Sequence, residues 1–185
     1  MATLAVVRVR SGSRALEVQI EGNATMLHAK AMREWVEANL QRLPQVRVDL
    51  SRCMYMDSTF IGTLLGLKRL ADARPSGGLV LVCLSPQCVQ LLDQMRIGQI
   101  FATETSPVSA SDWQEVSVPP DAIKSRAFQC NVVEAHQRLA DCPGPTGERF
   151  RQLAEDMSRE LLQKEEPAEK DPRLAETWVF GDKRG

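Results

Sequence analysis

Hydrophobic and polar residues alternate at the start of the chain, which is typical of β-strands. Leu4–Arg10 and Ala15–Ile20 are short, rich in β-branched residues and separated by Ser11-Gly12-Ser13, the composition of a hairpin. From His28 to Leu43 the apolar residues recur every three or four positions, which predicts an amphipathic helix that Pro44 ends. The chain is therefore expected to open with two strands and a helix.

The sequence pattern in the middle of the chain predicts alternating strands and helices. Strands are expected at Val46–Leu50 and Leu79–Leu84, each followed by a helix, at Ser58–Arg74 and Pro86–Arg96. Consecutive parallel strands need a crossover connection, so this order predicts a sheet with parallel pairs covered by helices. Ile100-Phe101 is expected to add a last short strand.

The pattern changes after a Ser-, Thr- and Pro-rich cluster at Thr103–Asp112. Asp121–Asp141 and Glu148–Lys164 each carry an apolar stripe at helical spacing, and Pro143–Gly147 joins them, which predicts an αα-hairpin. The stripes consist of Phe128, Val132, Ala135 and Leu139, and of Phe150, Leu153, Met157 and Leu161. The sequence leaves open whether they pack on the sheet domain, on each other or on a second molecule.

These patterns divide the chain into an α/β domain at 1–102, a linker at 103–120, a helical hairpin at 121–164 and a tail at 165–185. The tail begins with the charged, Pro-containing stretch Glu165–Arg173 and is predicted to be disordered. Trp178-Val179-Phe180 near its end is interpreted as part of a loosely packed tail, with a short docking motif as the alternative.

Charge and composition exclude several classes of protein. Lys and Arg number 23 against 24 Asp and Glu, so a dedicated nucleic-acid binder is not expected. No apolar run reaches the roughly 20 residues that span a bilayer, which predicts a soluble, cytoplasmic protein without membrane association. The five cysteines, without C-x-x-C spacing, are interpreted as reduced thiols, and the two histidines offer little for a metal site, so no cofactor is expected.

The polar turn Asp57-Ser58-Thr59, at the start of the second predicted helix, is the most specific local feature. One of these side chains suffices to cap the helix, which leaves two hydroxyl-bearing residues for another role. Ser58, Gly62, Gly66 and Arg69 share one helix face, and each glycine costs about 1 kcal/mol relative to alanine. The bare face is explained either by close packing against the protein's own sheet or by a flat, solvent-facing partner surface, which the apolar opposite stripe favours.

The segment from the strand before Asp57 through Gly62 and Gly66 to Gly77-Gly78, Leu79–Leu84 and Ser85-Pro86 resembles the STAS domain of anti-sigma factor antagonists. The resemblance covers about residues 4 to 102. It implies a small mixed β-sheet flanked by α-helices and no catalysis. It also implies a kinase-type anti-sigma factor as partner, which phosphorylates Ser58, and a phosphatase that restores binding. Asp57, Thr59, Gly62, Gly66 and Arg69 are then the expected partner-binding residues.

Two features depart from the family pattern. Many relatives have a glycine two positions after the phosphorylated serine, where this chain has Phe60, a ring that either packs inward or alters the partner surface. The hairpin beyond Pro120 is not part of the common pattern, so it is expected to set the oligomeric state, which stays open, or to choose the partner. A phosphate on Ser58 would add about −1.5 to −2 charges at the partner surface and weaken binding.

Other functions are less well supported. A STAS module that docks in a larger signalling complex without phosphorylation shares every feature except the need for a free Ser58 hydroxyl. An enzyme with Ser58 as nucleophile needs a base, and neither histidine is expected near it. A nucleotide site lacks the G-x-x-x-x-G-K-[ST] loop, and a transporter domain lacks a membrane span. On the open-surface hypothesis, Gly62→Arg abolishes partner binding without changing thermal stability by more than a few degrees.

Overall fold

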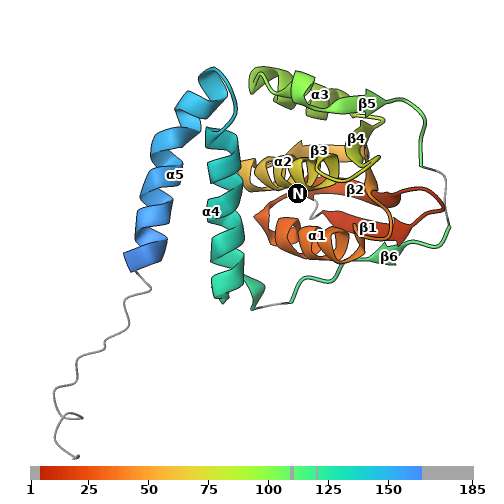
Figure 1. The fold of residues 1–185 in the computed structure, drawn as a ribbon, viewed down its shortest axis with the longest axis horizontal. Coiled ribbons are helices and arrows are strands. Elements are labelled where there is room, and N and C mark those ends of the chain that lie inside the picture. The colour runs from red at the N-terminus through yellow and green to blue at the C-terminus, as the bar shows by residue number, and fades with distance from the viewer. Residues whose placement is uncertain (1–4, 109–110, 120, 164–185) are drawn as a thin grey trace, which may run out of the picture.

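The computed structural model describes residues 5–108, 111–119 and 121–163, which form a sheet, a layer of helices and an outer helical hairpin (Figure 1). The strands are β1 (Val6–Ser11), β2 (Leu16–Ala24), β3 (Gln45–Met56), β4 (Gly78–Val82), β5 (Ala102–Glu104) and β6 (Gln114–Glu115). The helices are α1 (Met26–Asn39), α2 (Ser58–Asp72), α3 (Pro86–Gln94), α4 (Arg126–Ala140) and α5 (Pro145–Gln163), with short 3₁₀ turns at Gly98–Ile100 and Ala122–Lys124.

The sheet is mixed, as the sequence predicts. Its order is β5-β4-β3-β2-β1-β6. β1 and β2 form the expected antiparallel hairpin, and β2 to β5 are parallel. β3 runs to Met56, six residues beyond the predicted strand, and the last parallel strand begins at Ala102 rather than at Ile100. The segment predicted as a linker contributes two short strands, of which β6 pairs with β1 at the far edge.

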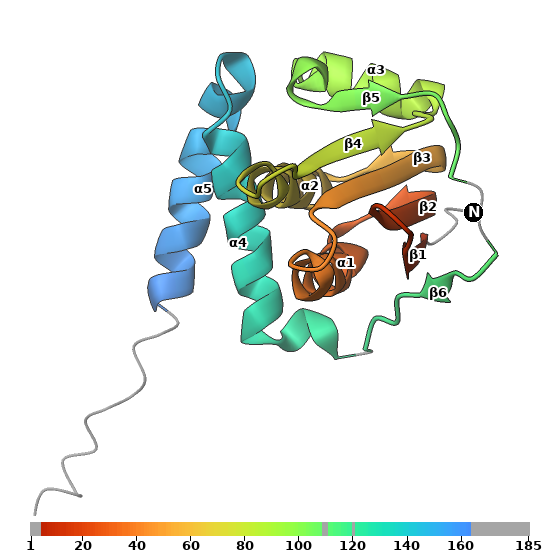
Figure 2. The same ribbon diagram turned by 45° about the vertical axis from the view of Figure 1, so that its right-hand side comes forward.

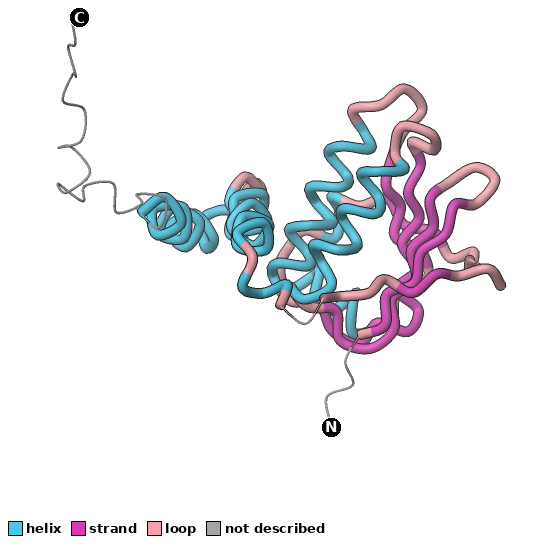
Figure 3. The backbone as a smooth tube through the Cα atoms, turned by 90° about the horizontal axis from the view of Figure 1, so that it is seen from below, coloured by secondary structure: helices cyan, strands magenta, loops and turns pink. Residues whose placement is uncertain are grey.

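One face of the sheet is buried and the other carries charges. In β2 the burial alternates strictly along the strand, with Leu16, Val18 and Ile20 fully buried. α1 and α2 cover this face side by side (Figure 3). The opposite face holds cross-strand ion pairs such as Arg8–Glu21, at 3.1 Å. The core therefore lies between the sheet and its helices, as a one-sided sheet requires.

Phe60 points into this core and is completely buried. Of the two orientations that the sequence left open, the ring adopts the inward one and does not form part of the outer surface of α2. The departure from the family pattern at this position is therefore absorbed by core packing.

The C-terminal hairpin forms a third layer outside α2. α4 crosses α2 steeply, and α5 packs on the far side of α4 (Figure 2). Of the three burial modes that the sequence left open, the α4 stripe packs against the α/β domain and α5. In α5, Phe150 lies against the core while Leu153 is exposed. The predicted disordered tail and Trp178–Phe180 lie outside the described residues.

The described residues contain no helix with the length and apolar character that a bilayer crossing requires. The same residues contain no group of three or more Cys, His, Asp or Glu side chains placed to hold a metal ion. All five cysteines are free thiols, and Cys53, Cys88 and Cys142 are buried.

Candidate functional site

Asp57 caps two helices at once. Its Oδ1 accepts the Phe60 N–H at 2.8 Å, in the first turn of α2, and its Oδ2 accepts the Met26 N–H at 2.7 Å, at the start of α1. Both bonds satisfy N–H groups that a helix N-terminus leaves without a partner. Burial lowers the pKa of nearby His28, and the charge of Asp57 partly opposes that shift. Asp57 therefore fixes the two helices relative to each other.

With Asp57 as the cap, the Ser58 hydroxyl is left for another bond, as the sequence analysis predicts. Ser58 Oγ lies 3.0 Å from Nε2 of His136 in α4. The other ring nitrogen, Nδ1, lies 2.8 Å from the carbonyl oxygen of Val132, which only accepts hydrogen bonds. Nδ1 therefore carries a proton, and in the neutral ring Nε2 accepts a hydrogen bond from the Ser58 hydroxyl. The ring of Phe150 in α5 flanks the imidazole at 5.8 Å.

The two glycines of α2 lie directly beneath α4. A Cβ placed on Gly62 would lie 2.6 Å from the carbonyl carbon of Ala135 and 2.8 Å from its Cα, closer than real Cβ atoms come. A Cβ on Gly66 would lie 2.8 Å from Cδ and Cζ of Arg138. Gly62 thus allows the backbones of two helices to touch, whereas Gly66 meets only a flexible side chain.

The expectation of a solvent-facing ridge is wrong for the chain in this arrangement. Gly62 and Gly66 are buried, and their cover is the protein's own α4, neither its sheet nor a separate partner. The physical reason is that two glycines one helical turn apart leave a groove that a second helix fills by close backbone approach. The sequence could not identify that helix, because α4 lies about 70 positions further along the chain.

Polar contacts flank the glycines. Arg33 of α1 pairs with Glu134 and donates to Asn131 Oδ1 at 3.3 Å, and Arg69 pairs with Asp141 at 2.9 Å. Burial raises the pKa of Glu134, but hydrogen bonds from Arg33 and Arg138 outweigh it, and the net shift is downward. The carboxylate therefore stays charged. One ion pair joins α4 to α1, and the other joins the turn after α4 to α2.

The structure brings four of the six predicted site residues to one place. Ser58, Gly62, Gly66 and Arg69 all contact α4 or the turn after it. Asp57 acts as a cap whose side-chain oxygens bind the starts of α1 and α2, and Thr59 is buried at 3% exposure. Whether any of them binds a partner stays a prediction.

His136 is the functional neighbour that sequence reasoning missed. We expected neither histidine to lie near Ser58, and that expectation is wrong, because His136 contacts it. A serine that donates to a neutral, oriented imidazole is the geometry of an activated nucleophile. Here, however, a backbone carbonyl orients the ring, and His136 is 6% exposed between α2 and Phe150. The pair serves as a helix–helix contact in this arrangement.

A second missed feature is a set of exposed apolar residues close in sequence to the starts of α1 and α2. Met54 and Tyr55, at the end of β3, are large and exposed, as is Met26, whose backbone N–H binds Asp57. Exposed apolar side chains are typical of protein-binding surfaces when they form one patch. The sequence pattern did not identify Met54 and Tyr55 as strand residues, because the predicted strand ended at Leu50.

A family model described as "Mlab, STAS domain" matches residues 7–102, more than half of the chain. The chain belongs to the STAS domain family. This confirms the resemblance inferred from the Asp57–Gly66 segment. The hairpin α4–α5 lies outside the residues that the family model matches.

Solved structures similar to this STAS protein include several anti-sigma factor antagonists. The unphosphorylated antagonist SpoIIAA has 16% identity and a TM-score of 0.48, over 54% of this chain and 89% of that one. An antagonist from Mycobacterium paratuberculosis has 16% identity and a TM-score of 0.46, over 56% and 87%. Phosphorylated SpoIIAA from Bacillus has 17% identity and a TM-score of 0.45, over 54% and 92%. No curated protein matches the chain.

The double cap predicts how substitutions at Asp57 affect stability. Asp57→Ala removes both acceptors and should lower the free energy of unfolding by about 2 kcal/mol. Asp57→Asn keeps one acceptor oxygen and should lose clearly less. Urea denaturation followed by far-UV circular dichroism measures both values, and equal losses for the two variants would contradict the double cap.

The glycine contacts predict opposite effects for the same substitution. Gly62→Ala forces α4 away from α2 and should lower stability by about 1 to 2 kcal/mol, even though alanine favours a helix. Gly66→Ala should be neutral or stabilise by up to about 1 kcal/mol, because the Arg138 side chain can turn aside. Chemical denaturation of the two variants provides the comparison. This replaces the expectation that Gly62→Arg leaves thermal stability almost unchanged, since an arginine there meets the α4 backbone.

Proposed function

We propose that this STAS protein is an anti-sigma factor antagonist-like regulator. It binds a serine-kinase-type anti-sigma factor through the surface around Ser58 at the start of α2, and phosphorylation of Ser58 weakens that binding. The observation that carries the proposal is that Asp57 and Ser58, adjacent at the start of α2, have different roles. Asp57 caps α2, and half-buried Ser58, the next residue, has no capping role.

The position of Ser58 suits a phosphate electrostatically. It is the first residue of α2, where the unpaired N–H groups and the positive end of the helix dipole stabilise negative charge. Phosphorylation would therefore leave the fold intact while adding about −1.5 to −2 charges to the surface. A partner that covers this surface would have to desolvate the phosphate, and its affinity would fall. A regulator of this kind acts in the bacterial cytoplasm.

Phosphorylation also changes the contact with His136. Phosphoserine Oγ has no proton to donate, so the bond from Ser58 to Nε2 is lost and two acceptors face each other. The imidazole must then gain a proton or move away. The modification would thus act on the α2–α4 contact as well as on an external partner.

A second candidate function is a STAS interaction module that is not phosphorylated. The observation in its favour is that the Ser58 hydroxyl is already engaged with His136 at 3.0 Å. In this case Ser58 is a contact residue only, and partner binding does not depend on a modification.

Phosphate transfer separates the two candidates. The full chain is incubated with the serine-kinase-type anti-sigma factors of the source organism and Mg-ATP, and phosphopeptides are mapped by mass spectrometry. The antagonist proposal predicts one phosphate, on Ser58, and no transfer to Ser58→Ala. Thr59→Ser is the matched control, because a buried hydroxyl at the next position should leave transfer to Ser58 unchanged.

Binding completes the comparison. Ser58→Asp should weaken affinity for the same anti-sigma factor about tenfold or more, and Ser58→Ala should bind like the parent chain. Binding without phosphate transfer, with Ser58→Asp equal to the parent, would support the unmodified module. If none of the anti-sigma factors binds, the antagonist proposal fails.

A further inference from the structure

We propose that the α4–α5 hairpin is a displaceable cover that occupies the partner surface of α2 in the resting protein. The inference rests on the proposed function in one respect, namely that α2 is where a partner binds. Partner binding then requires the hairpin to leave, and the hairpin sets a threshold for binding. The cover itself is a property of this chain alone and is testable without the partner.

α4 already occupies the outer face of α2. α4 contacts Ser58, Gly62 and Gly66, the residues that make the outer face of α2 flat. α4 fills this face with Ala135, which lies against Gly62, and with the polar side chain of His136 one residue later. A second helix cannot use the same groove while α4 remains there.

Many of the contacts between the hairpin and the STAS domain are polar. The polar groups are half-buried Ser58, buried Asn131 and His136, and the Arg33–Glu134 and Arg69–Asp141 ion pairs. Asn131 Nδ2, on α4, is buried without a hydrogen-bond partner. Groups of this kind regain hydrogen bonds with water on separation, which favours release. Polar contacts are typical of interfaces that open, whereas permanent cores are apolar.

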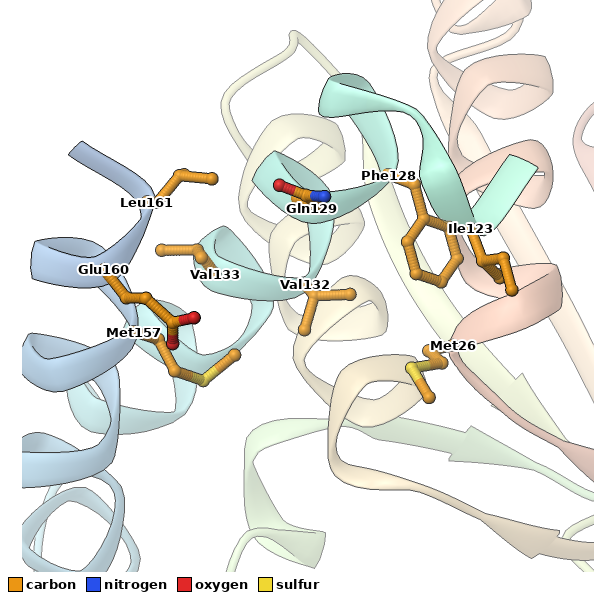
Figure 4. Close-up of a pocket in the computed structure, with 9 residues that line it drawn as sticks. All are labelled: Met26, Ile123, Phe128, Gln129, Val132, Val133, Met157, Glu160 and Leu161. Carbon is orange, nitrogen blue, oxygen red and sulfur yellow. The ribbon is translucent and has the colours of Figure 1, made fainter. Parts of the chain in front are cut away.

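The hairpin packs incompletely against the STAS domain at the start of α1. A groove of about 270 Å³ lies where the hairpin meets the start of α1 (Figure 4). Met26 borders it from the STAS domain, while Phe128, Val132 and Met157 border it from α4 and α5. Apolar side chains that face a gap of this size lose contacts that a continuous core would provide. The hairpin therefore does not complete the core of the STAS domain at this end.

Contacts at the other end explain why the covered form is the resting one. Leu139 and Cys142 reach the main hydrophobic cluster, and Thr146 donates to the carbonyl oxygen of Met95. The chain before α4 is tied to the sheet through β6, where Val116 N–H binds Val7 at 2.8 Å. This tether keeps the effective concentration of α4 near α2 high, so the cover closes again when a competitor leaves.

The test supplies α4 a second time, as a free peptide. A fluorescein-labelled peptide with the sequence of residues 126–141 is titrated into three full-length chains: the parent, Ala135→Leu and Ala127→Leu. Leucine at buried position 135 collides with Gly62 and should expel the chain's own α4, while α2 stays unchanged. Ala127 is an exposed residue of the same helix, so Ala127→Leu is the matched control.

The cover predicts that fluorescence anisotropy reports peptide binding to Ala135→Leu at least about tenfold tighter than to the parent or to Ala127→Leu. Adding Gly62→Leu to Ala135→Leu should abolish that binding, because the groove is then filled. Equal binding by all three chains, or no binding by a folded Ala135→Leu chain, would overturn the proposal. Loss of the cooperative thermal transition in Ala135→Leu would also overturn it, since α4 would then be an integral part of the fold.

Because this readout contains no anti-sigma factor, it fails or succeeds independently of the proposed function. A cover without any anti-sigma factor binding would leave the displaceable hairpin in place and refute only the proposed partner. Anti-sigma factor binding, without tighter peptide binding to Ala135→Leu than to the parent, would refute only the displaceable hairpin.

Discussion

The close approach of α2 and α4 at Gly62 is the constraint on which the arrangement of this protein depends. Side-chain bulk at Gly62 would overlap the backbone of Ala135, so glycine here is a requirement of helix packing. Once the backbones touch, Ser58 comes within hydrogen-bond distance of His136 and Arg69 reaches Asp141. The glycine that suggested an open partner surface is thus also the residue that allows the chain to cover that surface.

Asp57 explains why the Ser58 hydroxyl is available for a contact outside its own helix. One carboxylate holds the starts of α1 and α2, and this leaves the neighbouring hydroxyl of Ser58 without a capping role. In the closed form the hydroxyl binds His136, and in an open form it would face solvent or a partner. The STAS domain supplies the rigid frame, and the added hairpin determines which of these states the frame presents.

Much of the fold follows from local sequence patterns. The β1–β2 hairpin, the alternating strands and helices up to α3 and the two C-terminal helices were all predictable, because each has its own periodicity and end signals. The edge strand β5 was expected two residues too early, at Ile100-Phe101, and β6 was not expected. Both are two or three exposed residues whose main strand signal is pairing with a neighbour. Likewise, Ser58 and the glycine face could be found from spacing, whereas His136 could not, because its contact with Ser58 joins positions 78 residues apart.

The protonation state of the His136 ring tests most directly whether α4 lies on α2 in solution. Nitrogen-15 NMR of the imidazole in the full chain distinguishes the two neutral tautomers. The structure requires the proton on Nδ1, bound to Val132, with Nε2 accepting from Ser58, and Ser58→Ala should shift the Nε2 resonance alone. A ring that carries its proton on Nε2, or whose nitrogens are unchanged by Ser58→Ala, would contradict the covered face.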